Sequence, residues 1–293
     1  MQIIDGKKLR GEILTKVKKE VAELPFKPVF CDVLVGDDPA SAQYVAMKAR
    51  TAETVGISFH KAIFPTSIST DDLVKEIKIL NKVPNMCGII VQLPLPTSLD
   101  KRAVLDSIDP HLDVDCLGTL ASDKFYNNYD SSTDLVFPTA LACMALLDSI
   151  DFPLEGKIII VLGQGELVGR PVSALLRSRD LIYQPITSKT ENKEYMLKQA
   201  DVIISGIGRS KYITGNMIKL GAVLIDAGTS EETSSKNIVG DVDLESVRNI
   251  AAYVSPVPGG VGPVTVAMLL NNVLKVAKNL TPSPSPERRG GLS

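Results

Sequence analysis

Tyr44 and Lys48 are the first pair of side chains in this sequence that could carry out chemistry. They lie four residues apart and follow a helix-start signal, Asp-Asp-Pro-Ala-Ser, at 37–41. On a helix this spacing places both side chains on one face, one turn apart. An exposed lysine beside a half-buried tyrosine is the ordinary explanation of such a pair. The neighbouring alanines are small, however, and a partly desolvated lysine can transfer a proton or polarise a reacting water.

Further polar candidates follow apolar runs in the first half of the chain. Gln92 ends a very apolar segment and precedes Leu-Pro-Leu-Pro at 93–96. Its amide must find a partner, either the backbone of this loop or a ligand or neighbouring lysine that it orients. Asp113 and Asp115 form a short acidic pair, for which a solvated loop is the default interpretation. A carboxylate there could also accept two N–H bonds from an amino-pyrimidine ring.

Two glycine-rich segments in the second half are candidates for close contact with a ligand. The segment 161–171 lies between an apolar run and a helical pattern, where backbone N–H groups at a helix start can bind phosphate. Its spacing, Gly163-x-Gly165-x-x-x-Gly169, is not the standard dinucleotide motif, so a plain connector stays equally open. The segment Ser-Pro-Val-Pro-Gly-Gly-Val-Gly-Pro at 255–263 has more prolines and glycines than a connector needs, which favours close approach of its backbone to a ligand.

The elements that must position these residues alternate between strand-like runs and amphipathic stretches. This order predicts two α/β domains with largely parallel sheets, the second a Rossmann-like NAD(P)-binding domain. Predicted strands of the first half are 29–35, 57–64 and 88–92, and its predicted helices are about 7–23, 40–55, 70–82 and 100–107. Predicted strands of the second half are 158–162, 181–186, 202–205, 223–226 and 251–254.

Domain limits follow from composition. The segment 109–134 is rich in Asp, Asn and Ser, and it is the best boundary. We therefore predict a first domain at 1–135 and a second at 136–262. A long apolar helix at 263–280 is expected to return to the first domain and complete it. The Pro/Ser/Gly-rich tail at 281–293 is predicted to be disordered.

Composition excludes several classes of function. The chain has 293 residues, 44% of them apolar, and a formal net charge of −2, so no basic surface for nucleic acid is expected. No segment has the pattern of a signal peptide or a membrane span, which predicts a cytoplasmic protein. The four cysteines are widely scattered and the two histidines have no partner at ligand spacing, so neither a metal site nor a catalytic triad is expected.

Taken together, these segments resemble the bifunctional methylenetetrahydrofolate dehydrogenase/methenyltetrahydrofolate cyclohydrolase family. The resemblance covers residue 4 to about 280. Its most specific parts are Tyr-Val-Ala-Met-Lys at 44–48, Val-Gln-Leu-Pro-Leu-Pro at 91–96 and Pro-Val-Pro-Gly-Gly-Val-Gly-Pro at 256–263. Gly-Ala-Val-Leu-Ile-Asp at 221–226 and Gly-Asp-Val-Asp at 240–243 add to it.

The resemblance implies two steps of one-carbon folate interconversion. A hydride passes from 5,10-methylenetetrahydrofolate to the nicotinamide, and water then converts the methenyl cation to 10-formyltetrahydrofolate. Lys48 would be central to the hydrolytic step, Tyr44 would stack on the folate rings, Gln92 would tune Lys48, and Asp115 would hold the pterin. The implied folate site also includes Val91, Leu93, Pro258, Gly259, Gly260, Val261 and Gly262. A homodimer is implied as well.

The sequence departs from the family pattern at three places. Cys116 replaces a usual glycine, and Phe-Pro-Thr-Ala-Leu-Ala at 137–142 keeps only the threonine of the usual Pro-Cys-Thr-Pro-x-Gly. Gln164 and Gly165 stand where Arg and Ser are common, and that arginine helps to bind the 2′-phosphate of NADP. The change at 116 bears on how Asp115 is presented, and the change at 137–142 bears on the shape of the cleft between the domains. The change at Gln164 and Gly165 bears on the choice between NADP and NAD.

The end of the second strand of this half bears on the same choice. It runs into Thr-Ser-Lys-Thr at 187–190, with no acid of the kind that binds the ribose 2′-hydroxyl of NAD. We therefore expect NADP, with NAD still open. The expected cofactor residues are Gly163, Gln164, Gly165, Ser188 and Thr229.

Three alternatives to the bifunctional enzyme differ in what they leave unexplained. A monofunctional dehydrogenase would need a compromised hydrolytic site, and the presence of Tyr44, Lys48 and Gln92 argues against one. A non-catalytic folate- or nucleotide-binding relative would account for the altered segments. An unrelated two-domain amino-acid dehydrogenase would give the turn at 256–263 no role.

Overall fold

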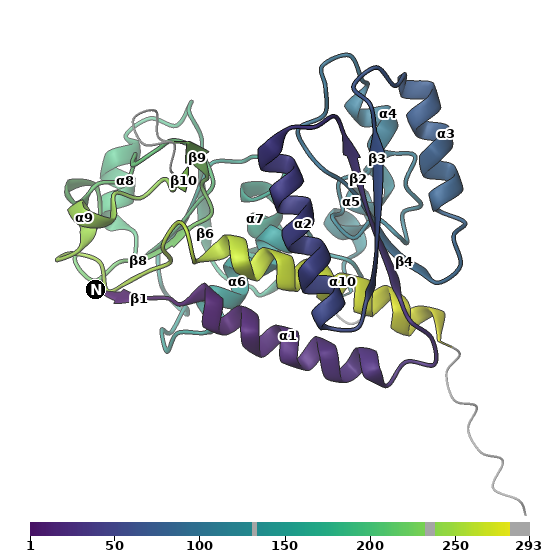
Figure 1. Ribbon diagram of the computed structural model, residues 1–293. Helices are drawn as coiled ribbons and strands as arrows, with labels where there is room; N and C mark the ends of the chain where they lie inside the picture. Colours follow the sequence, from purple (N-terminus) through teal and green to yellow (C-terminus); the bar gives the residue numbers. More distant parts are fainter. Residues whose placement is uncertain (131–133, 232–237, 282–293) are drawn as a thin grey trace, which may run out of the picture.

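The computed structural model describes residues 1–130, 134–231 and 238–281. Within them the chain forms two α/β units, each with a parallel sheet, as predicted (Figure 1). The first sheet has the order β3-β2-β4, with β2 at Val29–Val35, β3 at Ser58–Phe64 and β4 at Met86–Val91. Both outer strands run parallel to β2, so the carboxyl ends of all three lie at one edge of the sheet.

Five helices accompany the first sheet. They are α1 (Gly6–Ala22), α2 (Pro39–Thr54), α3 (Thr70–Leu80), α4 (Lys101–Leu105) and α5 (Thr119–Asn128). The first four agree with the sequence prediction. Helix α5 was not predicted, because it lies in the polar segment interpreted as a boundary. Phe125 is its buried anchor and contacts the ring of Phe137 edge-on, so tertiary packing stabilises a weakly periodic helix.

The second sheet has six parallel strands in the order β1-β11-β8-β7-β5-β6. Their bounds are β1 (Gln2–Ile3), β5 (Ile159–Leu162), β6 (Tyr183–Ile186), β7 (Val202–Ser205), β8 (Val223–Asp226) and β11 (Tyr253–Val254). Strand β1 was not predicted, because two residues carry no period. It forms at the edge of β11 and ties the start of the chain to the second unit.

Helices and a short hairpin complete the second unit. The helices are α6 (Pro138–Asp148), α7 (Gly169–Ser178), α8 (Lys193–Gln199), η1 (Gly215–Met217) and α9 (Leu244–Val247). Strands β9 (Ser230–Glu231) and β10 (Ile238–Val239) pair in antiparallel fashion. The glycine-rich segment lies between β5 and α7, as the sequence predicted.

The C-terminal helix α10 (Val261–Leu280) joins the two units. It packs along α1 and α6 and against β4, and Figure 1 shows it crossing from the second unit into the first. One apolar core contains buried residues of α10 and of both sheets, and a smaller core lies under α8 and α9. The predicted return of this helix is therefore confirmed. Of the predicted tail, only Thr281 is among the described residues.

In the described part of the chain, no helix combines the length and the apolar character needed to cross a membrane.

Candidate active site

Lys48 is the centre of the candidate folate site. Helix α2 begins at Pro39, and the Asp38 side chain caps it by accepting the N–H of Ser41 at 2.8 Å. The helix lies against β2 and β3, and Lys48 on its buried face is only 2% exposed. Its Nζ lies 2.8 Å from Oε1 of Gln92 and 2.7 Å from Oδ2 of Asp32. Gln92 and Asp32 thus hold the ammonium group of Lys48 from two sides, beside the first sheet.

The Gln92 side chain bonds both to the backbone of its own loop and to Lys48, the two kinds of partner that the sequence left open. Its backbone N–H donates to the oxygen of Val33 at 2.9 Å, immediately after β4 ends. Its side-chain Nε2 donates to the oxygen of Leu93 at 2.7 Å, which closes the loop, while Oε1 accepts from Lys48. Because Lys48 can only donate, this orientation of the amide is the one the contacts require. Val91 before it is buried, and Leu93 after it is half-buried.

The Tyr44 ring lies beside the same ammonium group. Its centroid is 5.1 Å from Nζ of Lys48, within the range of a cation–π contact. The residue is nevertheless 37% exposed, so it presents aromatic surface that the protein itself does not cover. Desolvation of the hydroxyl, with the carboxylates of Asp115 and Asp32, raises the pKa of Tyr44 to about 12. The hydroxyl is therefore a neutral hydrogen-bonding group at physiological pH.

The two members of the acidic pair have different surroundings. Asp113 is buried, and its Oδ2 accepts the N–H of Gly118 at 2.7 Å, so it holds the loop after the pair. Asp115 is half-buried and interacts electrostatically with Lys48 and Tyr44. The pKa of Asp115 is raised to about 7, chiefly by desolvation, with the charge of Lys48 opposing the rise and the charges of Asp113 and Asp32 adding to it. Asp115 is therefore the member that can act on a ligand.

Helix α10 fixes the loop that carries this pair. The buried Asn272 donates from Nδ2 to the oxygens of Val114 at 2.9 Å and Val136 at 2.7 Å. Cys116 follows with φ of 59°, in the left-handed region that favours glycine. A glycine, expected here from the family resemblance, would adopt this backbone conformation without strain. The buried Cys116 adopts the same type of turn at some cost in strain.

Asp32 is a residue of this site that the sequence reasoning missed. It lies in the middle of β2, is fully buried, and pairs with Lys48. The signal was present, because one acid interrupts an otherwise apolar run, and a buried carboxylate needs a partner. What the sequence did not give was the identity of that partner.

The turn at 256–262 is anchored on the start of α1. A Cβ at Gly6 would lie 2.0 Å from the oxygen of Gly260, so the two backbones are in direct contact. Gly259 has φ of 111°, and the N–H of Gly260 donates to the oxygen of Pro256 at 2.7 Å. Space around a Cβ at Gly262 is open. The turn leads into α10, and its close backbone contact is with the start of α1.

The glycine loop between β5 and α7 has a different role for each glycine. A Cβ at Gly169 would lie 1.9 Å from the oxygen of Gly163. The start of α7 can therefore pack against the end of β5 only because residue 169 has no side chain. Gly163 has φ of 93°, as a tight turn demands. A Cβ at Gly165 would meet nothing within 4 Å. Helix α7 has no side-chain cap, but the N–H of Arg170 donates to the oxygen of Gly165 at 3.2 Å and Pro171 has no N–H. Of the first three residues of the helix, Gly169 is therefore the one that can offer its N–H to a ligand.

The remaining cofactor candidates lie on loops that follow strands of the same sheet. Gln164 turns back on its own loop, where Nε2 donates to the oxygen of Gly163 at 2.8 Å and to Oγ of Ser173 at 3.3 Å. Ser188, after β6, and Thr229, after β8, are both exposed. Parallel strands place all three loops at the carboxyl edge of the sheet, where ligands of such sheets bind.

Two buried carboxylates shape this edge, and the sequence reasoning gave them no such role. Asp226 accepts backbone N–H groups of Gly228 and Val242 at 2.9 Å each. Asp241 accepts Ser205 Oγ at 2.6 Å and the N–H of Ile207 at 2.9 Å. Burial raises the pKa of Asp226 to about 6, and the N–H groups oppose that rise. These are structural groups that hold the loops after β7 and β8.

Side chains from the two units also meet beside the glycine loop. Glu166 in the loop lies 3.2 Å from Nζ of Lys101 on α4, and Arg170 on α7 lies over the ring of Tyr126 on α5. A hollow of about 440 Å³ begins next to this contact and is lined by 93–97, Leu99 and Lys101. Lys101 therefore both lines the hollow after Gln92 and pairs with Glu166 of the glycine loop.

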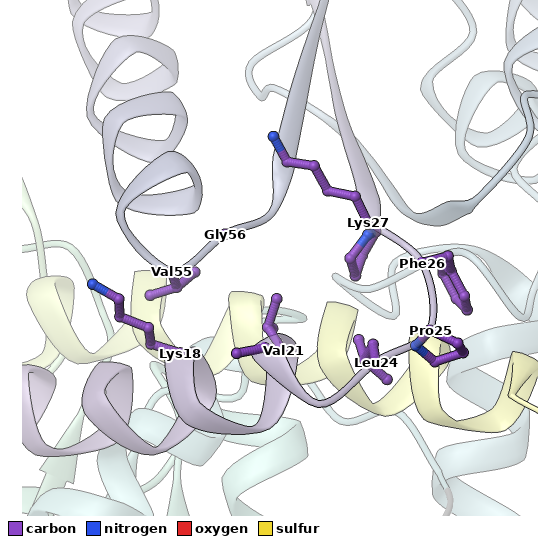
Figure 2. Close-up of a pocket in the computed structure, with 10 residues that line it drawn as sticks. Lys18, Val21, Leu24, Pro25, Phe26, Lys27, Val55 and Gly56 are labelled. Atoms are coloured by element: carbon purple, nitrogen blue, oxygen red, sulfur yellow. The ribbon is translucent and has the colours of Figure 1, made fainter.

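A second hollow lies at the opposite edge of the first sheet. This groove of about 420 Å³ is lined by residues from the end of α1, the start of β2 and the end of α2, including Lys18, Phe26, Lys27 and Val55 (Figure 2). It faces the amino ends of the strands, whereas Gln92 follows a carboxyl end. The groove is therefore separate from the candidate site.

Comparisons with known proteins agree with this arrangement. Residues 4–115 match the catalytic domain of tetrahydrofolate dehydrogenase/cyclohydrolase, and residues 138–281 match the NAD(P)-binding domain of the same family. The bifunctional protein FolD of a Nitratiruptor species is 42% identical over 95% of this chain and 98% of its own length. The corresponding protein of Moorella thermoacetica is 40% identical over 94% and 99%.

Solved structures show the same relationship in three dimensions. The bifunctional enzyme FolD of Campylobacter jejuni has a TM-score of 0.90 and 35% identity, covering 95% of this chain and 99% of its own. The FolD of Trypanosoma brucei, complexed with NADP cofactor and inhibitor, has a TM-score of 0.88 and 33% identity, covering 94% and 97%. The chain therefore belongs to the tetrahydrofolate dehydrogenase/cyclohydrolase family.

Proposed function

We propose that this chain catalyses both reactions of its family. The first is oxidation of 5,10-methylenetetrahydrofolate to the 5,10-methenyl cation with NADP, and the second is hydrolysis of that cation to 10-formyltetrahydrofolate. One observation carries the proposal: Nζ of Lys48 is held by Gln92 and Asp32 at the carboxyl edge of the first sheet, beside an exposed Tyr44 ring. This arrangement offers a flat apolar surface and a directed ammonium group within reach of one ligand.

The hydrolytic step needs positioning and proton management. Water adds to the electrophilic methenyl carbon and releases one proton, which leaves a hydroxyl group on that carbon. The hydroxyl proton is then lost as the formyl C=O forms, and the bond from the carbon to N5 breaks with N5 taking up a proton. Lys48 would orient the water and the oxygen that forms, because its remaining N–H is not used by Gln92 or Asp32. Tyr44 would stack on the folate ring, and Asp115 would accept N–H bonds from the pterin.

The second unit fits a dinucleotide. Gly165 leaves open space before α7, and the start of this helix has no side-chain cap, which suits a pyrophosphate. When bound, the nicotinamide accepts a hydride from the methylene carbon of the folate. The turn from Pro258 to Gly262 would line the gap between folate and nicotinamide, and its open Gly262 supports that role.

NADP is the preferred dinucleotide in this proposal. Strand β6 ends at Ile186, and the exposed residues after it are Thr187, Ser188 and Lys189. A hydroxyl and a cation suit a 2′-phosphate, whereas NAD sites place an acid at this strand end. Gln164 is turned back on the loop and so leaves the phosphate contacts to the residues after β6.

Three finer statements belong to the same proposal. We place the folate domain at 1–135, apart from β1, which pairs with the second sheet, and the NAD(P)-binding domain at 136–262. Helix α10 would complete the first domain, which its packing along α1 supports. We also propose a homodimer, which rests on the family resemblance. A cytoplasmic location is the third statement of this proposal.

One assay tests the proposal. Purified protein is mixed with methylenetetrahydrofolate and either NADP or NAD, and reduced nicotinamide and methenyl absorbance are followed separately. We expect reduction with NADP to exceed that with NAD, and supplied methenyltetrahydrofolate to be hydrolysed faster than in buffer. No reduction with either dinucleotide would contradict the dehydrogenase activity. Reduction without enhanced hydrolysis would identify a monofunctional dehydrogenase.

A further inference from the structure

Asp32 is an unusual residue for the strand it occupies. It is fully buried in β2, which has β3 on one side and β4 on the other. Its Oδ2 forms an ion pair with Nζ of Lys48 at 2.7 Å, and among the described residues neither carboxylate oxygen has a partner in hydrogen-bonding geometry. An apolar side chain would suit the interior of a sheet better, because a buried carboxylate loses its hydration. Stability alone therefore does not explain an acid at this position.

The contacts of Lys48 show what the acid supplies. Gln92 Oε1 is a neutral acceptor and cannot balance the charge of an ammonium group buried to 2% exposure. Asp32 is the carboxylate in direct contact with Nζ, and it makes the Lys48 head group part of a neutral pair. The hydrogen bond to Gln92 and the ion pair with Asp32 together fix the position of Nζ as well as balancing its charge.

Other charged or titratable groups face this pair from each neighbouring element. Lys61 pairs in register with Asp32 from β3 and interacts with it electrostatically. Tyr44 lies on α2 and Asp115 on the loop that α10 fixes, with Asp113 behind it. Burial and the adjacent Asp32 charge raise the pKa of Cys31 to about 12, so this thiol stays neutral. Asp115 is the group whose titration Asp32 affects near neutral pH.

This charge matters for the second reaction in particular, and the inference rests on the proposed function. Methylenetetrahydrofolate is neutral at its reacting carbon, whereas the methenyl intermediate is a cation. An ammonium group without a countercharge would repel that cation strongly in a site from which water is excluded. We propose that Asp32 is a positioning residue of the hydrolytic step, which neutralises Lys48 and directs its Nζ so that the methenyl cation is held and hydrolysed beside it.

The test compares two variants that remove the charge in different ways. Asp32→Asn keeps the shape of the side chain, and Asp32→Val places a residue suited to a strand interior. Hydrolysis of methenyltetrahydrofolate is measured as kcat and KM from pH 5.5 to 8.5 after subtraction of the uncatalysed rate. Hydride transfer from methylenetetrahydrofolate to NADP is measured with the same preparations, and thermal melting reports folding.

We expect both variants to raise KM for methenyltetrahydrofolate by about tenfold, with hydride transfer changed by less than about threefold. The acid limb of the hydrolysis profile should move to lower pH. The Asp32 charge raises the pKa of Asp115, so its removal lowers that pKa. A purely structural role for Asp32 would lower the melting temperature and both activities together, without moving the pH profile.

Asp134→Asn is the matched control. Asp134 is also a buried carboxylate of the first half, paired with Lys124 at 2.6 Å and with the N–H of Asp130 at 2.8 Å. Its removal should leave KM and the profile unchanged. Folded Asp32 variants with the wild-type KM and profile would overturn the inference while leaving the proposed function intact. Absence of hydrolysis in the wild type would instead overturn the proposed function.

Discussion

The two candidate sites of this molecule are built by opposite means. Around Lys48, side chains from α2, β2 and the end of β4 meet, and their charges are buried together. At the glycine loop the ligand surface is backbone, made accessible because Gly163 and Gly169 have no side chain to keep the strand end and helix apart. The first site should therefore respond to a change of charge, and the second to the addition of a single carbon atom.

Lys48→Met gives the largest expected effect and tests the first half of this comparison. Hydrolysis of methenyltetrahydrofolate should fall on the order of a thousandfold, because the group that directs the reacting water is lost. Hydride transfer should persist at a measurable rate, since the second unit is unaltered. The control is Lys75→Met, an exposed lysine paired with Asp72, which should leave both rates unchanged. Full hydrolytic activity in Lys48→Met would refute the assignment of Lys48.

Gly169→Ala tests the second half. The new Cβ would stand 1.9 Å from the oxygen of Gly163, so β5 and α7 must move apart. We expect the free energy of unfolding to fall by about 3 kcal/mol and KM for the dinucleotide to rise at least about tenfold. Hydrolysis should be affected less than hydride transfer. Urea unfolding and steady-state kinetics give the two quantities.

Two other glycines, Gly165 and Gly11, serve as controls for Gly169. They distinguish the effect of steric crowding on stability from the effect of a new side chain on dinucleotide binding. Gly165→Ala places its Cβ in open space, so stability should change by less than about 0.5 kcal/mol while dinucleotide binding weakens. Gly11→Ala, also in open space but within α1, should stabilise the protein by about 0.5–1 kcal/mol with no kinetic effect. Equal losses of stability at 165 and 169 would contradict the distinct roles given to these glycines.

Asp115 allows a test by pH. Burial raises its folded pKa to about 7, whereas the unfolded value is about 4. Between these values the folded chain keeps a proton that the unfolded chain has lost, so stability falls as pH rises through this window. Asp115→Asn should make the free energy of unfolding decline less between pH 4.5 and 7.5, as urea titrations at both pH values would show.

Asp201 supplies the opposite sign as a control. The hydrogen bond from Lys219 lowers its pKa, so its contribution is present above the unfolded pKa and is lost as pH falls. Asp201→Asn should therefore reduce stability near neutral pH and have little effect in acid. The same sign of pH dependence in both variants would contradict the difference in their surroundings.

Cys116→Gly gives the smallest expected effect. Glycine removes the backbone strain at φ of 59°, which should raise the free energy of unfolding. The loss of the buried thiol and the greater freedom of glycine in the unfolded chain should lower it by nearly the same amount. We expect a net change below about 1 kcal/mol and unaltered kinetics. Cys116→Val should destabilise more, because a β-branched side chain is poorly tolerated at positive φ. Thermal melting of the two variants and of the wild type measures this difference in stability.

The sequence predicted the elements whose signal is local. The strand at 29–35 agrees with β2, and the apolar helix at 263–280 agrees with α10 apart from its first turn. Helix α5 and strand β1 were missed, since both depend on surfaces supplied by distant segments. Cys116 was recognised as a departure from the family, and only the backbone angle explains why a glycine is usual there.

The sequence alone predicted the alternation of strands and helices along the chain, the glycine-rich loop and the proline-rich turn. Each of these depends on backbone geometry or apolar period over a few residues. The pairing of Lys48 with Asp32 and Gln92 was decided by tertiary structure. Asp32 lies on β2, and Gln92 directly follows the neighbouring parallel strand β4. Lys48 lies on the helix packed against β2, and Gln92 is 44 residues further along the chain than Lys48. No local pattern specifies which buried charges will meet, since that depends on the register of the sheet and on how α2 packs against it.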